Sequence, residues 1–394
     1  MKKIELAKGI EALSTLDYDL KVFDVIMKTE FGSSYNAYLI HGKEKTALVD
    51  GTKPSFFGGF LDALKGEKPD YLVVNHTEPD HSSSLELMLK TYPDSVVVAT
   101  PVGLDFARQL VNHDFPSLPV KGSLQLDLGE RVLELVAMPN LHWPDTMWVY
   151  DKESEILFPC DGFGAHFCSP YLRLSEMPDE VKRQYREARK FYYDVIMSPF
   201  ASFVDKGLSY AKALPLKMIA PGHGPVIDED IEQLYADYEK FNLRKEKDQV
   251  VIAYGSAYGK TRKLAEALAK GVRESGLGVC VFDLENANLD AVAKEVLSSR
   301  GFLLGSCTIL SDALPVAYEL TTRMNPVAYH GKRAAAFGVY GWSGEAVANL
   351  STRLGQLRMK VEEGLRVRFE PTVEELKQAQ EYGKQFGLKI TKGE

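Results

Sequence analysis

The sequence predicts an α/β protein with two domains, a sandwich of sheets covered by helices followed by a doubly wound parallel sheet. Short apolar runs of strand length crowd the first 245 residues, whereas strands and helices alternate strictly after residue 249. A charged stretch at 240–249 separates the two patterns, so we place the domains at 1–247 and 248–394. A chain of 394 residues is long enough for two ordinary domains.

The first segment mixes strand patterns with helical ones. Apolar runs rich in β-branched and aromatic residues predict strands at 35–40, 46–49, 71–75, 95–99, 132–136 and 147–150. Helical periodicity is present at 84–91 and again in the long run 179–195. Many short strands with helices between and after them favour stacked sheets with helices on the outside.

The second segment repeats one unit, a strand followed by a helix. We predict strands at 250–254, 279–283, 301–305, 333–338 and near 365, and helices at 260–275, 289–298, 315–324, 344–357 and 373–386. Strands joined through helices run parallel. Ligands of such sheets bind at the carboxyl ends of the strands, where the strand order reverses.

Composition excludes several classes of protein. The net charge of -8 argues against a nucleic-acid groove, and no apolar run approaches the roughly 20 residues that span a bilayer. The polar N-terminus does not resemble a signal peptide, and the four cysteines form no CxxC pair. We therefore expect a cytoplasmic protein with reduced thiols and with neither nucleic acid nor membrane as a partner. Cys160 and Cys168 could ligate a metal, but better ligands lie near them.

The densest cluster of potential metal ligands follows the predicted strand at 71–75. It contains His76, Glu78, Asp80 and His81. In extended chain, residues two apart point the same way, so His76 and Glu78 can converge on one ion. Pro79 bends the chain, and the two groups beyond it can serve a second ion. A single ion would not need all four groups.

Three further candidates stand in turns rich in glycine and proline, each after a predicted strand. They are His142 in LHWPD, Asp161 in CDGFG and His223 in PGHGP. Loops at one end of a rigid sheet are where binding groups gather. We assign His76, Glu78 and His142 to the first ion, Asp80, His81 and His223 to the second, and Asp161 to both as a bridge. The remaining histidines are interpreted as surface or hydrogen-bonded residues: His41, His113, His166 and His330.

The second segment has a candidate phosphate loop after its first strand. Small and hydroxyl-bearing residues at a strand-to-helix turn can hold a phosphate with backbone N–H groups and hydroxyls. The loop has neither the GxxxxGK[ST] nor the GxGxxG pattern. The segments after the third and fourth predicted strands would lie at the same edge of the sheet and could contact the same ligand. The candidate ligand-binding residues therefore form three groups: Ser256, Ala257, Tyr258, Gly259, Lys260 and Thr261; Cys307, Thr308, Ile309 and Leu310; Tyr340, Gly341, Trp342, Ser343 and Gly344.

The motif series HxExDH, LHWPD, CDGFG and PGHG resembles that of the flavodiiron proteins, and GSAYGKT resembles the flavodoxin loop that binds the phosphate of FMN. The resemblance covers roughly residues 5–390. It implies a metallo-β-lactamase-like αββα sandwich, a flavodoxin-like domain, FMN and two non-haem iron ions. Hydrolytic relatives of the first domain usually carry histidine where this chain has Glu78. The extra anionic oxygen favours iron that changes oxidation state, without excluding zinc.

The resemblance also implies a function. Electrons would pass from FMN to the di-iron site, which would reduce dioxygen to water and/or nitric oxide to nitrous oxide. A rubredoxin-like protein would supply the electrons, and the chain would form a head-to-tail homodimer or a tetramer. Some members carry a histidine over the iron pocket, but the matching region here reads Phe23 and Asp24. The pair Tyr192 and Tyr193 resembles a tyrosine lining that pocket, and we name Tyr193 as the candidate proton donor.

Two alternatives stay open from the sequence. One is a dinuclear zinc hydrolase fused to a flavodoxin module. The other is a flavin carrier or redox sensor whose first domain is only a scaffold. Metal analysis distinguishes the zinc hydrolase from the di-iron enzyme. Oxygen consumption by the reduced protein distinguishes the carrier or sensor from it. The sequence ranks neither dioxygen against nitric oxide nor dimer against tetramer.

Overall fold

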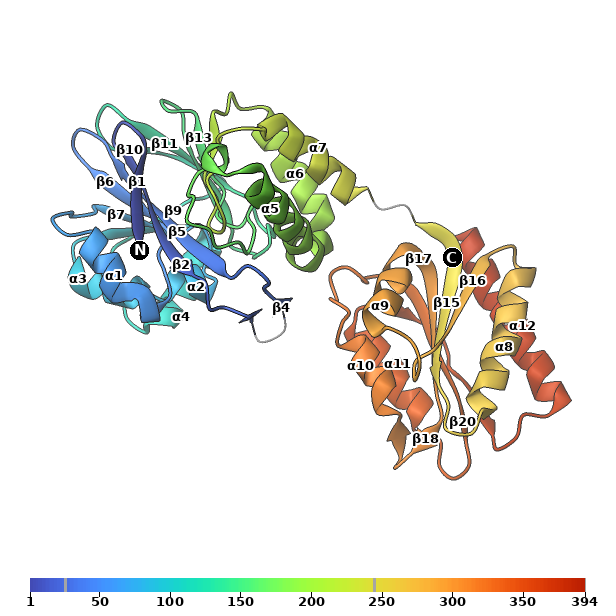
Figure 1. The fold of residues 1–394 in the computed structure, drawn as a ribbon. Coiled ribbons are helices and arrows are strands. Elements are labelled where there is room, and N and C mark those ends of the chain that lie inside the picture. Colours follow the sequence, from blue (N-terminus) through green and yellow to red (C-terminus); the bar gives the residue numbers. More distant parts are fainter. Residues whose placement is uncertain (25–26, 244–245, 394) are drawn as a thin grey trace. The chain divides into compact units, whose positions relative to one another are not determined.

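The structure is a computed structural model that describes residues 1–24, 27–243 and 246–393. The chain divides into two compact units, Met1–Leu243 and Arg244–Glu394. Arg244 and Lys245, which belong to the charged stretch between the two sequence patterns, lie outside the described residues. The predicted fold class is confirmed, since the first unit is an αββα sandwich and the second a doubly wound sheet (Figure 1).

Two sheets form the centre of the first unit. The larger has the order β1-β2-β5-β6-β7-β8-β9 and is antiparallel from β1 to β6 and parallel from β6 to β9. Its strands are β1 Lys2–Ala7, β2 Ile10–Asp17, β5 Ser33–His41, β6 Thr46–Val49, β7 Tyr71–Val73, β8 Val96–Ala99 and β9 Ser117–Pro119. The smaller sheet contains β10 Ser123–Asp127, β11 Val132–Ala137, β12 Met147–Asp151, β13 Ile156–Phe158 and β14 Met218–Ile219. A separate hairpin pairs β3 Val22–Phe23 with β4 Met27–Lys28.

Helices cover the outer face of each sheet (Figure 1). The larger sheet packs under α1 Phe57–Ala63, α3 Leu85–Thr91 and α4 Pro101–Val111, and the smaller under α5 Asp179–Tyr192, α6 Ala201–Lys212 and α7 Ile231–Asn242. The alternation along β5 shows the layers, because Tyr38 packs between the sheets while Leu39 packs toward the helices. Short turns complete the unit: α2 Pro79–Ser82, the 3₁₀ turns Pro54–Phe56, Leu174–Glu176 and Ser198–Phe200, and the π-helical turn Tyr193–Met197.

The first unit contains elements that the sequence did not reveal. No range was predicted for strands β1, β2, β3, β4, β9, β10, β13 and β14 or for helices α1, α2, α4, α6 and α7, although the turns at Asp161 and His223 implied a strand before each. Several of these strands are short, and β1 alternates charged with apolar residues at an exposed edge, which weakens an apolar signal. The predicted helix 179–195 ends at Tyr192 and continues as the π-helical turn. That change of pitch matters for the side chains at its junction.

The second unit has the predicted parallel sheet, with the order β16-β15-β17-β20-β21 and β22 also paired with β20. Its strands are β15 Lys247–Gly255, β16 Gly278–Asp283, β17 Ser299–Ser306, β20 Arg333–Tyr340, β21 Lys360–Val361 and β22 Leu365–Arg368. Helices α8 Lys260–Glu274 and α12 Val373–Lys392 cover one face, and α9 Leu289–Ser298, α10 Pro315–Thr321 and α11 Ala346–Gln356 cover the other. A small hairpin joins β18 Thr308–Ile309 to β19 Asp312–Ala313.

The topology places the candidate loops of each unit at the ends of neighbouring strands. In the second unit the loops follow β15, β17 and β20, which are adjacent and parallel, so they meet at one edge of the sheet. In the first unit they follow β7, β11, β13 and β14. Within the described part of the chain, no helix has both the length and the apolarity that a bilayer crossing requires.

Candidate metal centre and flavin cavity

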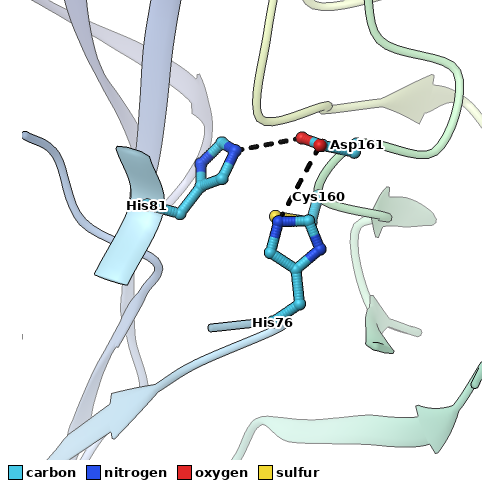
Figure 2. Close-up of side chains that lie close together, drawn as sticks. All are labelled: His76, His81, Cys160 and Asp161. Carbon is cyan, nitrogen blue, oxygen red and sulfur yellow. Dashed lines mark ion pairs between the residues drawn. The ribbon is translucent and has the colours of Figure 1, made fainter. Parts of the chain in front are cut away.

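The structure brings the seven predicted metal-ligand side chains together in the first unit. Loop residues supply His76, Glu78, His142, Asp161 and His223, and the single turn of α2 supplies Asp80 and His81. The His142 side chain is the most exposed at 14 %, while the others are nearly or completely buried. Figure 2 shows His76 and His81 facing the Asp161 carboxylate, with ion-pair contacts drawn from each ring.

The seven side chains form two groups that share Asp161. In the first group, His142 Nε2 lies 3.1 Å from Glu78 Oε2 and 3.0 Å from Asp161 Oδ2. The His76 Nε2 atom is 3.5 Å from the same Glu78 oxygen. Asp161 therefore presents its Oδ2 atom to this group and keeps its other oxygen for the second.

The second group mirrors the first. His223 Nε2 lies 3.1 Å and His81 Nε2 3.5 Å from Asp80 Oδ2. The Asp161 Oδ1 atom is 3.0 Å from His81 Nε2 and 3.5 Å from His223 Nε2. Each group thus contains two imidazoles, one carboxylate of its own and one oxygen of Asp161.

The donor atoms converge without satisfying one another. Among the described residues, these buried donor atoms have no hydrogen-bond partner: both ring nitrogens of His76 and of His81, His223 Nε2, Glu78 Oε2, both Asp80 oxygens and Asp161 Oδ1. Several of them lie within ion-pair distance, yet the angles are not those of hydrogen bonds. Leaving so many polar atoms unpaired in a protein interior is costly. Two cations, one per group, would give partners to the Nε2 atoms and carboxylate oxygens that converge in each group, so these side chains fit a pair of metal ions.

Protons and metal ions compete for this cluster. Burial lowers the pKa of His81, but the Asp80 and Asp161 carboxylates beside it outweigh burial and hold that pKa at about 10. Burial likewise lowers the pKa of His142, but the Asp161 and Glu78 carboxylates, 3.0 and 3.1 Å from its Nε2 atom, raise it to about 10. Without metal, protons therefore balance the buried carboxylates. Metal ions that replace them must release those protons on binding.

Hydrogen bonds outside the cluster orient the turn that carries His223. The His223 Nδ1 atom lies 2.7 Å from the Ser34 carbonyl oxygen, to which its N–H donates. This tautomer leaves the Nε2 lone pair free to face Asp80. The Asn36 amide donates to the Pro221 carbonyl at 2.9 Å. Gly222 is required here, because a Cβ atom would lie 2.7 Å from His81 Cε1.

The loop after β7 is fixed at two points. Asp50 accepts hydrogen bonds from the Asn75 backbone N–H at 2.9 Å and from its side-chain amide at 3.0 Å. Asp145 accepts from the Thr77 N–H at 2.9 Å and from the Thr77 hydroxyl at 2.8 Å. His76 lies between these two anchors, so its position is set by buried polar contacts on both sides.

Cys160 lies beside the metal cluster (Figure 2). Its sulfur is within 4.8 Å of ligand atoms of His76, His81 and Asp161. Burial, with the neighbouring Asp50 carboxylate to which the thiol hydrogen-bonds, raises the pKa of Cys160 well above its ordinary value. A protonated thiol is a poor ligand, and both groups already have their donors. Cys168 lies elsewhere, near Tyr18.

The second unit has a cavity of about 830 Å³ at the edge where its candidate loops meet. Ten of the predicted cofactor residues line it: Ser256, Tyr258, Lys260, Thr261, Cys307, Thr308, Ile309, Tyr340, Gly341 and Trp342. Five others are not among the lining residues: Ala257, Gly259, Leu310, Ser343 and Gly344. Leu310 is 95 % exposed, and the Ser343 hydroxyl donates to Glu345 at 2.8 Å.

One end of the cavity fits a phosphate. The Thr261 hydroxyl is buried and has no hydrogen-bond partner among the described residues, and it stands in the first turn of α8. Gly259 precedes that turn with φ +75°, a conformation that glycine adopts without strain. The positive end of a 15-residue helix and an unsatisfied hydroxyl favour an anion at this place.

Comparison with known proteins supports the fold of both units. The family model described as "ODP family beta lactamase" matches residues 34–224, and the flavodoxin model matches 252–383. The flavo-diiron protein FprA2 of Clostridium acetobutylicum is 35% identical, with 99% of this chain and 100% of that protein covered. The chain belongs to the flavodiiron protein family.

Other flavodiiron relatives match along their whole length. A nitric oxide reductase of Moorella thermoacetica is 34% identical, with 98% of each chain covered. The crystal structure of the flavodiiron protein from Giardia intestinalis superposes with a TM-score of 0.69 at 26% identity, with 100% of this chain and 97% of that one covered. The domain pair and its order are therefore those of the family.

Tyr192 packs beside a histidine of the metal cluster, whereas the ring of Tyr193, the candidate proton donor from the sequence, packs on α7. The Tyr193 hydroxyl donates to Asn242, and its ring packs against Tyr238 and Phe241. The Tyr192 ring lies 4.9 Å from that of His166 and 6.1 Å from that of His223. Tyr185, Arg189 and Tyr192 share the buried face of α5, a periodicity that could have identified Tyr192.

The sequence also missed residues at both sites of this flavodiiron chain. His166, interpreted as an ordinary histidine, is buried between Phe23 and His223 and pairs with the Ser33 hydroxyl at 3.0 Å. At the flavin cavity, the segment after β22 adds Arg368, Phe369 and Glu370 to the lining. Glu370 forms ion pairs with Lys260 and Lys263. No local pattern marks these three positions, since the topology alone brings them to the cavity.

Proposed function

We propose that this chain is an oxidoreductase that passes electrons from FMN in the second unit to two iron ions in the first. There it reduces dioxygen to water and/or nitric oxide to nitrous oxide. The observation that carries the proposal is the pair of ligand groups joined by Asp161. A second observation, the unpaired Thr261 hydroxyl in the first turn of α8 at the cavity of about 830 Å³, supports the flavin.

Each ion would have its own set of ligands. His76, Glu78 and His142 would hold one ion, and Asp80, His81 and His223 the other. Asp161 would contribute one oxygen to each. When bound, a pair of ferrous ions supplies two electrons and a binding position for a small gas, and reduced FMN supplies two more electrons.

The nature of the donors favours iron. Three carboxylates stand among four imidazoles, and the Cys160 thiol beside them is not needed to complete either set. Anionic oxygen stabilises the higher oxidation state, as a redox site needs. Zinc has one oxidation state and would support hydrolysis instead. Membership of the flavodiiron family, together with the flavodoxin unit, supports reduction over the zinc-hydrolase alternative.

The protein side chains near the metal cluster have two tasks in this reaction. The Tyr192 hydroxyl, beside Asp161, is our candidate for proton donor in place of Tyr193. The rings of Phe23, Trp143 and Phe200, which pack against cluster histidines or His166, keep bulk water away from the reacting gas.

The flavin would be held at three strand ends. Its phosphate would accept hydrogen bonds from Ser256, Thr261 and the first turn of α8, with Lys260 adding positive charge. The residues after β17 and β20 would border the ring. Trp342 is 94 % exposed at the rim of the cavity and is free to cover a planar ligand.

The donor and the assembly are further parts of the proposal. We propose a rubredoxin-like donor and a head-to-tail homodimer or tetramer, which would bring one chain's flavin to the metal site of another. Light scattering of the purified protein gives the assembly, and anaerobic flavin reduction by purified rubredoxin tests the donor. The relative from Moorella thermoacetica is a nitric oxide reductase, which supports nitric oxide as one substrate.

The decisive experiment uses the full chain loaded with iron and FMN, with both contents measured. The protein is reduced anaerobically, excess reductant is removed, and dioxygen and nitric oxide are added to separate samples. Consumption of at least one gas, with water or nitrous oxide as product, is the expected result. Full zinc occupancy with hydrolytic turnover, or iron-loaded protein that consumes neither gas, would refute the proposal.

A further inference from the structure

The proposed reaction needs protons inside a buried site. Dioxygen takes four electrons and four protons to give two waters, and two nitric oxide molecules take two electrons and two protons to give nitrous oxide and one water. The side chains around the metal cluster are nearly all buried. Protons must therefore travel through groups in the protein, and the inference that follows rests on the proposed function.

Four buried polar atoms on α5 and α7 make no hydrogen bond of good geometry within the described protein. They are the hydroxyls of Tyr185, Tyr192 and Tyr238 and the Nε atom of Arg189. The three tyrosines are at most 1 % exposed, and all three belong to the same hydrophobic core. Buried polar atoms without protein partners are the usual sites of ordered water.

These groups run from the metal cluster toward the surface. Tyr185, Arg189 and Tyr192 stand at i, i+4 and i+7 on the buried face of α5. The Tyr192 ring lies 6.1 Å from that of His223 and 4.9 Å from that of His166, so this side chain is at the cluster. The guanidinium of Arg189 lies over the ring of Tyr185, 5.6 Å from the centroid.

Tyr238 faces the α5 groups from α7. Its ring packs on Phe163, two residues after Asp161, with the centroids 5.0 Å apart. Burial raises the pKa of Tyr238, and the charges that act on its hydroxyl are those of Arg189, Tyr185, Tyr193 and Asp161. The Tyr238 ring also packs on that of Tyr193, next to Tyr192 in the chain, with the centroids 5.4 Å apart, and Tyr238 follows Asp237, the ion-pair partner of Arg189.

The outer end of this series reaches solvent. Arg189 pairs with Asp237, whose side chain is 23 % exposed. Gln233 donates to the other Asp237 oxygen at 2.9 Å. Water thus has access to the Asp237 carboxylate, while Arg189 holds one end of the buried polar series in place.

We propose that Tyr185 and Tyr238, bridged by ordered water and positioned by Arg189, relay protons from solvent at Asp237 to Tyr192 and the metal cluster. Each hydroxyl gives one proton inward and takes one from its outer neighbour, so each stays neutral. Bound gas receives the protons as it is reduced, and the electrons come from the flavin and the ions. Tyr193 and Tyr235, although close in the same core, are outside the relay.

The test compares Tyr238→Phe and Tyr185→Phe with Tyr235→Phe. Tyr235 is the matched control, because it lies on the same helix, is 4 % exposed and already donates to the Ala211 carbonyl at 3.3 Å. Full-length protein of equal iron and FMN content is reduced and mixed with dioxygen in H₂O and in D₂O. Flavin reoxidation in a single turnover removes any limit set by the external donor.

Removal of a relay hydroxyl is expected to slow reoxidation by about tenfold or more, within the range that positioned proton transfer contributes. The solvent isotope effect should rise, added imidazole should restore part of the rate, and the double variant should be no slower than the slower single one. Tyr235→Phe should match the wild type.

Wild-type rates and isotope effects in both Tyr238→Phe and Tyr185→Phe would overturn the relay. If the wild type itself consumes neither gas, the proposed function fails and the relay with it.

Discussion

Asp161 is the side chain on which both halves of the metal cluster depend. Its two oxygens face different imidazole pairs at 3.0 Å, from His142 on one side and from His81 on the other. No other cluster carboxylate contacts histidines of both groups. Loss of its charge should therefore affect two ions and not one.

The Asp161→Asn variant should retain less than one metal ion per chain, against about two in the wild type, because each site loses an anionic donor. Metal analysis of the purified proteins measures this. The matched control is Cys160→Ser at the preceding residue, which we expect to keep both ions. Full metal content in Asp161→Asn would contradict the bridging role, and loss of metal in Cys160→Ser would make the thiol a ligand.

Tyr192→Phe should lower turnover per iron by roughly 100-fold, the lower range of general acid contributions. Tyr193→Phe should leave turnover nearly unchanged. It should cost about 1–3 kcal/mol in unfolding free energy, because Asn242 loses its hydroxyl partner in a mostly buried site. Steady-state gas consumption and urea unfolding of the two variants separate the roles. The opposite pattern would return the donor role to Tyr193.

The residues of the metal cluster could be predicted because the signal is local. Four of them fall within 76–81, and each of the others stands in a short turn after a strand. Tyr192 and Tyr193 show where such reasoning fails. Both are buried and adjacent in the chain, and only the packing shows that the Tyr192 ring lies near His223 while the Tyr193 ring packs on α7.

At the scale of elements, the first turn of α8 determines whether the second unit can hold a phosphate. The Thr261 hydroxyl in this turn has no hydrogen-bond partner among the described residues, and Gly259 before it has a left-handed backbone conformation. Both features favour the binding of an anion. The strict alternation of strand and helix made this unit predictable to within a few residues at most boundaries. The lining from Arg368 to Glu370 was not predictable, because it depends on β22 pairing beside β20.

Thr261→Val should weaken FMN binding by about 1.5–3 kcal/mol, the contribution of a hydrogen bond to a charged group, which is roughly a tenfold to hundredfold rise in Kd. Titration of flavin-free protein with FMN, followed by fluorescence quenching, gives the constant. Ser343→Ala is the control, since Ser343 is outside the cavity lining. Equal affinities for Thr261→Val and the wild type would move the phosphate away from α8.

At the scale of the whole molecule, two compact units each have their own core and their own candidate ligand site. The many strands of the first unit were only partly predictable, because short strands such as β13 and β14 gain their stability from pairing between distant segments. The order of the two units, in contrast, follows from motifs that lie far apart in the chain.

Each unit should respond to its own ligand. A chelator should lower the unfolding midpoint of the first unit and leave the second unchanged, whereas FMN at about 100 times its Kd should stabilise the second by about 2.7 kcal/mol. Intrinsic fluorescence and flavin release during urea unfolding separate the two transitions. A single transition that shifts equally with either ligand would contradict separate sites.

Anomalous diffraction at the iron absorption edge, from crystals of the iron-loaded protein, tests the central claim most directly. We expect two peaks per chain, one within reach of His76, Glu78 and His142, the other within reach of Asp80, His81 and His223, with Asp161 contacting both. A single peak, peaks that appear only at the zinc edge, or imidazoles turned away from the density would contradict it.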